Sequence, residues 1–125
     1  MQVTGGRMTI IIAGTVDFPP EVREEALQAG IPHVEAARAE KGCIHYVWSP
    51  DYLTPGRIYV YEEWATQEDL AAHLVAPPYF NMRDTLAGFG LLGAETTKYR
   101  IDRAEPVYDE TMTATAYFTD ETPPS

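Results

Sequence analysis

One histidine of this 125-residue chain combines a residue type and a position suited to proton chemistry. A neutral imidazole can accept a proton near neutral pH, and His73 lies in the segment Leu70-Ala71-Ala72-His73-Leu74. In a helix, Leu70, His73 and Leu74 share one side, which would hold the imidazole over an aromatic sheet face. Two interpretations fit this placement: a base that takes a proton from a ligand, or a core histidine bonded to a backbone carbonyl.

A carboxylate is predicted on the sheet face that His73 covers. Glu62 alternates with Val60 and Trp64, so these three side chains point the same way from one strand. Paired with His73 or Tyr46, Glu62 could orient a base. The alternatives are an acceptor for helix amides and a charge at the rim of the sheet.

Large aromatic side chains surround these two groups in the predicted arrangement. They offer rigid surfaces that could line a pocket for a flat aromatic ligand, or fill a small core. They are Tyr46, Trp48, Trp64, Tyr79 and Phe80. Arg83, one helical turn beyond the last two, could hold an anionic or phenolic oxygen, or pair on the surface with Asp84.

Other residue types with chemical potential lack the required partners. His33 and His45 have no ligand spacing with His73, so no metal site is predicted, and no Gly-x-Gly-x-x-Gly dinucleotide fingerprint occurs. Cys43 follows a predicted helix C-terminus, which disfavours a thiolate. Any redox chemistry would therefore come from the substrate or from a cofactor that the sequence does not signal.

Composition limits the classes of partner. The chain carries 19 acidic and 9 basic residues, for a net charge of −10, and its basic residues are scattered from Arg7 to Arg103. This charge argues against nucleic acid and anionic membrane surfaces. The longest apolar run, within 8–13, falls far short of the roughly 20 residues of a membrane helix. With no secretion signal and a single cysteine, we expect a cytoplasmic protein.

Periodicity predicts one α+β domain. Predicted strands cover 8–16, 43–49, 57–64 and 91–101; predicted helices cover 20–42, interrupted at Pro32, then a segment from Thr66 to before Pro77, and 79–89. The order strand, helix, strand, strand, helix, strand is the ferredoxin-like βαββαβ arrangement with a four-stranded antiparallel sheet. We expect residues 1–7 to be a flexible N-terminus, 8–105 the domain, and 106–125 a tail that is disordered or pairs with a partner chain.

Both faces of the predicted hairpin are apolar or aromatic. A turn centred near Leu53 places one set of residues on one face, namely Ile44, Tyr46, Trp48, Ile58, Val60, Glu62 and Trp64. The other face receives Cys43, His45, Val47, Tyr59, Tyr61 and Glu63. Helices cover only one face of such a sheet, so the second face predicts contact with another subunit, as a homodimer formed sheet to sheet.

Three fragments in this order resemble the antibiotic biosynthesis monooxygenase family. They are 40–46 (EKGCIHY), 61–66 (YEEWAT) and 70–80, which holds His73 nine residues after Trp64 and ends in Pro-Tyr-Phe. The resemblance implies a dimeric α+β barrel with a pocket between sheet and helices. It also implies oxidation of phenolic, quinol or anthrone-like substrates by O2 without flavin, haem or metal.

By this resemblance, His73 would be the base or proton relay. Trp64 and Tyr46 would be walls or hydrogen-bonding partners of the substrate ring, and Glu62 would orient His73 or Trp64. Phe80 and Arg83 would close the mouth of a pocket that Trp48 and Tyr79 also line.

Three alternatives stay open at this point. Haem-degrading monooxygenases are similar in fold, but they use an Asn on the first strand and a later helical His, where this chain has Ala13, Gly14 and a 79–89 segment without His. Isomerases of small hydroxy-ketones would use His73 without O2. A non-catalytic barrel that binds an aromatic ligand would need the pocket but not the base.

Overall fold

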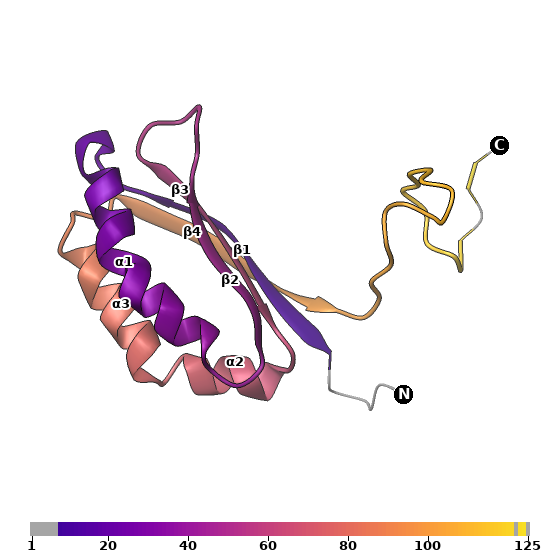
Figure 1. Ribbon diagram of the computed structural model, residues 1–125, viewed down its shortest axis with the longest axis horizontal. Coiled ribbons are helices and arrows are strands. Elements are labelled where there is room, and N and C mark those ends of the chain that lie inside the picture. Colours follow the sequence, from indigo (N-terminus) through magenta and orange to yellow (C-terminus); the bar gives the residue numbers. More distant parts are fainter. Residues whose placement is uncertain (1–7, 122, 125) are drawn as a thin grey trace.

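The computed structural model describes residues 8–121, 123 and 124 as one antiparallel sheet with helices on one face (Figure 1). Its strands are β1 (Thr9–Asp17), β2 (Cys43–Pro50), β3 (Arg57–Trp64) and β4 (Gly93–Ile101), in the order β2-β3-β1-β4. The helices are a 3-10 turn (Pro20–Val22), α1 (Arg23–Arg38), α2 (Gln67–His73) and α3 (Pro77–Ala87). This is the predicted α+β ferredoxin-like fold. The predicted flexible N-terminus, 1–7, lies outside the described residues.

The β2–β3 hairpin has the predicted register over most of its length. Tyr46 faces Glu62 and Trp48 faces Val60 across the two strands. The register shifts between Cys43 and His45, so that Cys43 faces Trp64 and packs against the core. Ile44 is 47% exposed, and the predicted faces of these two residues were therefore wrong. A β-bulge is the physical reason, because one extra residue in a strand reverses the direction of the side chains before it.

Helix α1 runs without a break through Pro32, contrary to the predicted interruption. A proline removes a single helical hydrogen bond, and burial of Ala26, Gly30 and Ala37 on α1 stabilises the helix on either side of it. The helix ends at Arg38, before the predicted stop at Gly42. Gly42 lies in the following turn with a φ of 80°, and a Cβ there would overlap Asp69 of α2.

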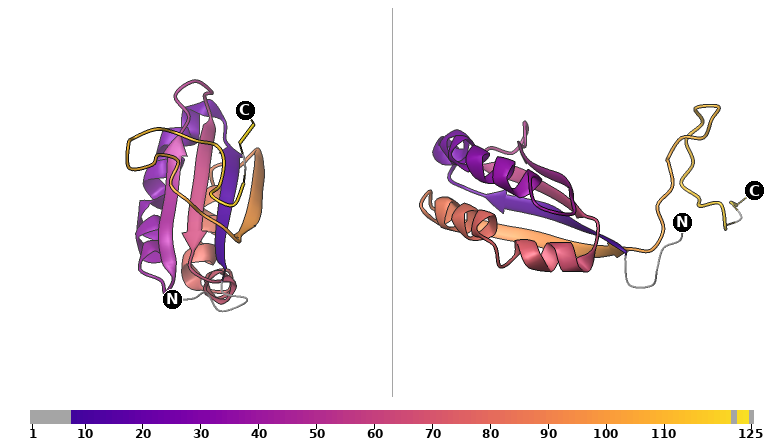
Figure 2. Two further views of the ribbon diagram at one scale, coloured as in Figure 1. Left: turned by 90° about the vertical axis from the view of Figure 1, so that its right-hand side faces the viewer. Right: turned by 60° about the horizontal axis from the view of Figure 1, so that its bottom comes forward.

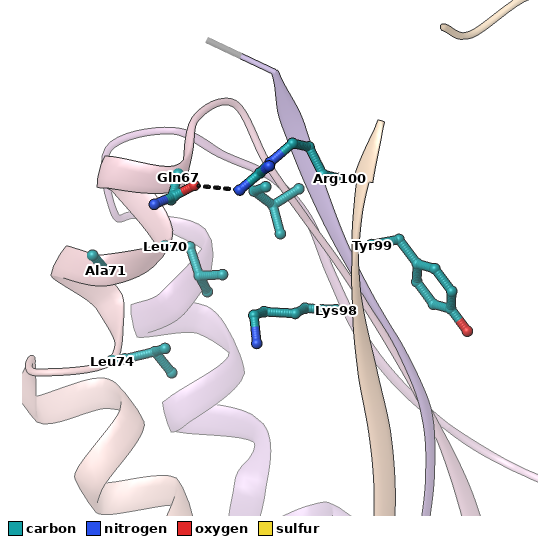
Figure 3. Close-up of a pocket in the computed structure, with 8 residues that line it drawn as sticks. Gln67, Leu70, Ala71, Leu74, Lys98, Tyr99 and Arg100 are labelled. Atoms are coloured by element: carbon teal, nitrogen blue, oxygen red, sulfur yellow. Dashed lines mark hydrogen bonds between the residues drawn. The ribbon is translucent and has the colours of Figure 1, made fainter. Parts of the chain in front are cut away.

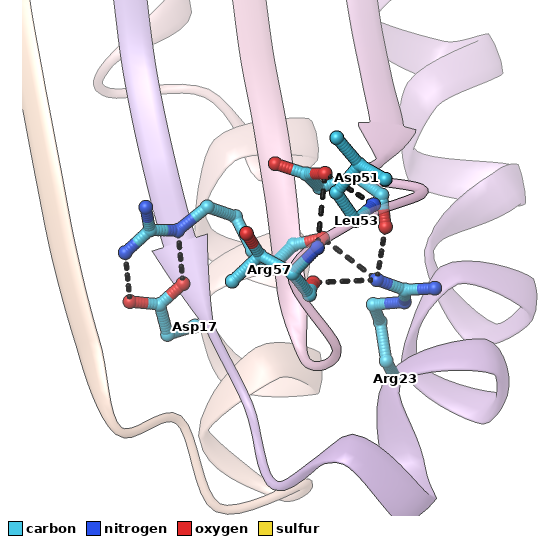
Figure 4. A network of polar contacts seen from close by, with 6 residues as sticks. Asp17, Arg23, Asp51, Leu53 and Arg57 are labelled. Atoms are coloured by element: carbon cyan, nitrogen blue, oxygen red, sulfur yellow. Dashed lines mark hydrogen bonds and ion pairs between the residues drawn. The ribbon is translucent and has the colours of Figure 1, made fainter.

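A polar network fastens the end of the sheet where the β2–β3 loop meets α1 (Figure 4). Arg57 donates two hydrogen bonds to the carboxylate of Asp17, at 2.9 and 3.0 Å. Arg23 donates to the backbone carbonyls of Asp51, Thr54 and Arg57. These bonds join β1, the hairpin loop and α1, so the hairpin is held at this end by charge-assisted contacts.

The described part of the tail extends beyond β4 on the side away from the helices (Figures 1 and 2). It contains a local turn in which Tyr108 bridges to Ala114 and Asp109 accepts bonds from Thr111 and Thr113. Several apolar side chains there are more than a third exposed, namely Val107, Tyr108, Met112, Tyr117 and Phe118. Pairing of this segment with a partner stays a prediction. Over the described residues, no helix has the length and hydropathy to cross a membrane.

Strand β4 lies against β1 at Gly14, where the two backbones approach closely. Gly14 is opposite Thr96, and a Cβ at Gly14 would overlap the backbone of Glu95 and Thr96. A side chain at this position would therefore push β4 outward. The close position of β4 beside β1 therefore depends on the absence of a side chain at Gly14.

We predict that Gly14→Ala lowers the free energy of unfolding by about 2 kcal/mol, because the added methyl cannot fit between the paired backbones. Urea unfolding measures the change. Gly93→Ala is the matched control, since a Cβ at Gly93 of the same strand pair meets nothing within 4 Å. Equal stability of the two variants would contradict the close approach.

Candidate active site

A cavity of about 310 Å³ lies between the sheet and helices α2 and α3. Six of the predicted site residues line it, namely Tyr46, Trp48, Glu62, His73, Tyr79 and Arg83. The remaining lining is apolar apart from Thr96, and comprises Ile12, Val16, Val60, Leu74, Met82, Leu86, Leu91 and Ala94. An apolar cavity with a few convergent polar groups is typical of a small-molecule site.

His73 is buried, with only 2% of its surface exposed, and one of its two ring nitrogens has a hydrogen-bond partner. Its Nδ1 lies 2.5 Å from the Glu40 carboxylate. Its Nε2 has no hydrogen-bond partner within 8–121. The Thr66 side chain caps the start of α2, the helix that ends at His73, by accepting a hydrogen bond from the Asp69 amide 3.0 Å away. The wall of the cavity therefore contains an imidazole whose orientation is fixed by a carboxylate.

Glu40 is a partner of His73 that the sequence did not predict. The two residues are 33 positions apart, and Glu40 lies just beyond the end of α1. The turn that follows contacts α2 through Gly42 and Asp69, which brings the carboxylate to the imidazole. The glycine after Glu40 was the one sequence signal for this turn, but it does not reveal which side chain lies opposite.

Trp64 and Glu62 form a second buried pair behind the imidazole. The Trp64 indole N–H donates to Glu62 Oε1 at 3.0 Å, and its ring centroid lies 4.6 Å from that of His73. Trp64 is completely buried and does not line the cavity, whereas Glu62 does. Glu62 thus orients Trp64, while the carboxylate bonded to His73 is that of Glu40.

Burial shifts the titration of two groups in the cavity wall. The pKa of Glu62 is raised, chiefly by burial, while the Trp64 hydrogen bond and His73 act in the opposite direction and Glu40 adds to the rise. The pKa of Tyr46 is also raised, first by burial and then by the charge of Glu62. Tyr46 is therefore a neutral hydroxyl at physiological pH.

The aromatic wall leaves one donor unsatisfied. Tyr46 and Tyr79 present their rings edge-on to His73, with centroids 5.7 and 5.9 Å away. Trp48 Nε1 is buried in the cavity wall and has no hydrogen-bond partner in the described part of the chain. A buried donor without a partner costs about 1–3 kcal/mol, and an oxygen of a bound ligand would satisfy it.

Phe80 and Arg83 lie together on α3. The Arg83 guanidinium is 5.0 Å from the centroid of the Phe80 ring, and its Nε donates to Asp84 at 3.2 Å. Arg83 lines the cavity, whereas Phe80 is 36% exposed and does not. One of the two predictions for Arg83 was a surface ion pair with Asp84, and this ion pair is present in the structure.

The remaining histidines and the cysteine lie apart from this arrangement. His33 contacts the Thr85 hydroxyl, and within the described residues no three His, Cys, Asp or Glu side chains are placed to bind a metal ion. Burial raises the pKa of Cys43, and the charges of Glu62 and Glu40 raise it further. The thiol is therefore a poor nucleophile.

The fold and cavity define the class of the protein, an α+β ferredoxin-like domain with a small-molecule pocket between sheet and helices. Residues 9–84 match the family model of antibiotic biosynthesis monooxygenases, and the chain belongs to this family. It is similar to the structure of a provisionally identified antibiotic biosynthesis monooxygenase from Deinococcus radiodurans, at 25% identity and a TM-score of 0.73, covering 80% of this chain and 99% of that one.

Two further proteins are similar to this chain. A provisionally identified member from Nitrosomonas europaea superposes with a TM-score of 0.68 at 22% identity, over 81% of this chain and 96% of that one. The uncharacterised protein sll1783 of Synechocystis is 29% identical over 80 residues, or 64% of this chain. The match spans 54% of that protein, about half its length.

We predict that Glu62→Gln gains stability relative to the parent chain as pH rises from about 4.5 toward neutrality. Because the folded-state pKa of Glu62 is raised above 4.5, the native state keeps a proton that the unfolded state has released, so parent stability falls with pH in this window. Gln retains an oxygen for the Trp64 N–H but does not titrate. Urea midpoints across pH measure the difference, with Glu63→Gln on the outer face as control. A pH-independent difference between Glu62→Gln and the parent would contradict the shift.

Proposed function

We propose that this protein is a cofactor-independent monooxygenase that uses O2 to oxidise a phenolic, quinol or anthrone-like substrate. One observation carries the proposal: a buried imidazole at the cavity wall, with Nδ1 bonded to Glu40 and Nε2 without a partner in the described chain. Family membership supports the same reaction class.

The Glu40 contact sets the role of each nitrogen of His73. A carboxylate accepts the Nδ1 proton, so the neutral ring carries its lone pair on Nε2. That nitrogen would take the proton of a phenolic hydroxyl, and Glu40 would stabilise the resulting imidazolium. The orphan Trp48 N–H would donate to an oxygen of the same substrate.

The substrate supplies the electrons in this proposal. An anthrone-type anion would transfer one electron to O2, and the resulting radical and superoxide would combine into a peroxide at a ring carbon. The His73 imidazolium would return its proton to give the hydroperoxide. Loss of water would leave a carbonyl, so one oxygen atom enters the product and the other leaves as water. The apolar cavity excludes bulk water from these intermediates.

We predict that the protein consumes O2 with a panel of hydroquinones, anthrones and naphthols, and that His73→Ala lowers turnover by about 10²-fold or more. Glu40→Gln should lower it less, because an amide can still hold the ring but does not stabilise the imidazolium. An oxygen electrode with metal-stripped protein measures the rates. His33→Ala, outside the cavity, is the control.

Two outcomes would overturn the assignment in different ways. Ligand binding without O2 uptake would indicate an isomerase or a non-catalytic binding barrel. Uptake that is unchanged in His73→Ala would leave a monooxygenase whose base lies elsewhere.

We infer further that the protein acts as a homodimer joined through the outer face of the sheet. Val47, Tyr59, Tyr61 and Tyr99 are each between 36% and 50% exposed on this face. Apolar patches of this kind mark interaction surfaces. The tail, which carries exposed apolar side chains, projects on the side of the sheet away from the helices and would reach a partner seated there.

We predict that the chain sediments at twice its 13.9 kDa mass and that Tyr61→Asp shifts it to a monomer, since the charge would lie buried in the centre of the interface. Analytical ultracentrifugation measures the mass. Tyr52→Asp places the same charge in the β2–β3 loop, where the side chain is 96% exposed, and should remain dimeric. A monomeric parent chain would exclude the proposed assembly.

A further inference from the structure

A second cavity, of about 410 Å³, lies beside the first between α2 and the edge strand β4 (Figure 3). Ile10, Leu70, Ala71 and Leu74 supply apolar surface, and Gln67, Lys98, Tyr99 and Arg100 complete the lining. The Lys98 side chain points from β4 toward α2, whereas the Tyr99 ring projects to the other side of the strand (Figure 3). Cationic and apolar groups therefore meet in one pocket.

The two cavities are neighbouring parts of one surface. Leu74 lines both of them. On β1, Ile10 lines the second cavity and Ile12 the first, two residues apart on the same face of the strand. Lys98 on β4 is the strand partner of Ile12 on β1, so the Lys98 side chain starts where the two cavities meet. A ligand that occupies both cavities could therefore extend from His73 toward Lys98.

The cations of this second cavity have no anionic partner in the described residues. Arg100 donates to the neutral amide of Gln67 at 3.1 Å, and Lys98 forms no ion pair. Elsewhere Arg57, Arg83 and Arg103 each pair with a carboxylate. Arg23 and Arg38 form no ion pair within the described residues either, but both donate to backbone carbonyls, whereas Lys98 and Arg100 line an apolar pocket. Lys98 and Arg100 provide charge for an anionic group on a ligand.

We propose that the physiological substrate is an aromatic carboxylate, whose phenolic end lies at His73 and whose carboxylate is bound by Lys98 and Arg100. The proposal rests on the proposed function for the position of the phenol. Apolar contacts with Ile10, Leu70 and Leu74 hold the carbon skeleton between the two ends. The cations select the substrate and orient it, and they take no part in the oxidation.

The test compares two ligands that differ only in the carboxylate, 6-hydroxy-2-naphthoate and 2-naphthol, by isothermal titration calorimetry. The parent chain should bind the naphthoate roughly tenfold more tightly, as expected for a charge-assisted contact at a partly exposed site. Lys98→Met should reduce this preference, with Arg100 supplying what remains, and should weaken the binding of the naphthoate more than that of 2-naphthol. Lys41→Met removes the other lysine, which is exposed and outside both cavities, and should keep the preference.

Further measurements separate this inference from the proposed function. 2-Naphthol should displace the naphthoate if both occupy the same cavity, and added salt should weaken only the naphthoate. Equal affinity for the two ligands, or equal losses for both in Lys98→Met, would overturn the carboxylate site even if O2 uptake is observed. A carboxylate preference that persists without any O2 uptake would leave the site intact and overturn the monooxygenase.

Discussion

The contact between Glu40 and the buried His73 joins the end of α1 to the end of α2. Glu40 follows α1, and His73 ends α2, so a single 2.5 Å contact fixes the turn, the helix and the ring together. Buried polar groups must be paired to be tolerated. The neighbouring carboxylate satisfies the same requirement, because Glu62 accepts from Trp64. After these pairings one buried side-chain nitrogen of the described residues has no hydrogen-bond partner, Nε1 of Trp48, a residue that lines the cavity.

Local patterns in the sequence were sufficient to predict the fold and the aromatic and charged side chains of the cavity wall. Alternation in the hairpin placed Tyr46, Trp48 and Glu62 on one face, because pairing across a short loop leaves few registers. Chain-distant contacts were not predictable in this way. Nothing local indicates that Glu40 reaches a histidine 33 residues away, or that the bulge would bring Cys43 to the core. The predicted break at Pro32 was wrong for the opposite reason. Proline disfavours a continuous helix locally, but packing of the whole helix outweighs this preference.

The edge strand was the least predictable element of the site. Its sequence, Gly-Ala-Glu-Thr-Thr-Lys-Tyr-Arg-Ile, shows alternation but little apolar content, and the strand is exposed along nearly its whole length. Its position depends on Gly14, which lets the two backbones approach. Only this placement shows that Ala94 and Thr96 belong to one cavity while Lys98 and Arg100 belong to the next. Tertiary structure thus turns a polar edge into one wall of a binding surface.

The distribution of charge along this surface bears on the proposed chemistry. Two carboxylates, Glu40 and Glu62, lie near His73, and unpaired cations lie beyond Leu74. Carboxylates close to a phenolate raise its energy, which makes the anion harder to form but a stronger one-electron reductant toward O2. A neutral imidazole that becomes cationic on taking the proton offsets the first effect, because Glu40 stabilises it. The cations lie in the second cavity, where they would bind a substrate carboxylate without stabilising the phenolate. Stabilisation of the phenolate would make it a weaker reductant. In the proposed reaction, separation of the two charged regions by an apolar stretch would therefore allow tight binding of the substrate and easy loss of an electron from it.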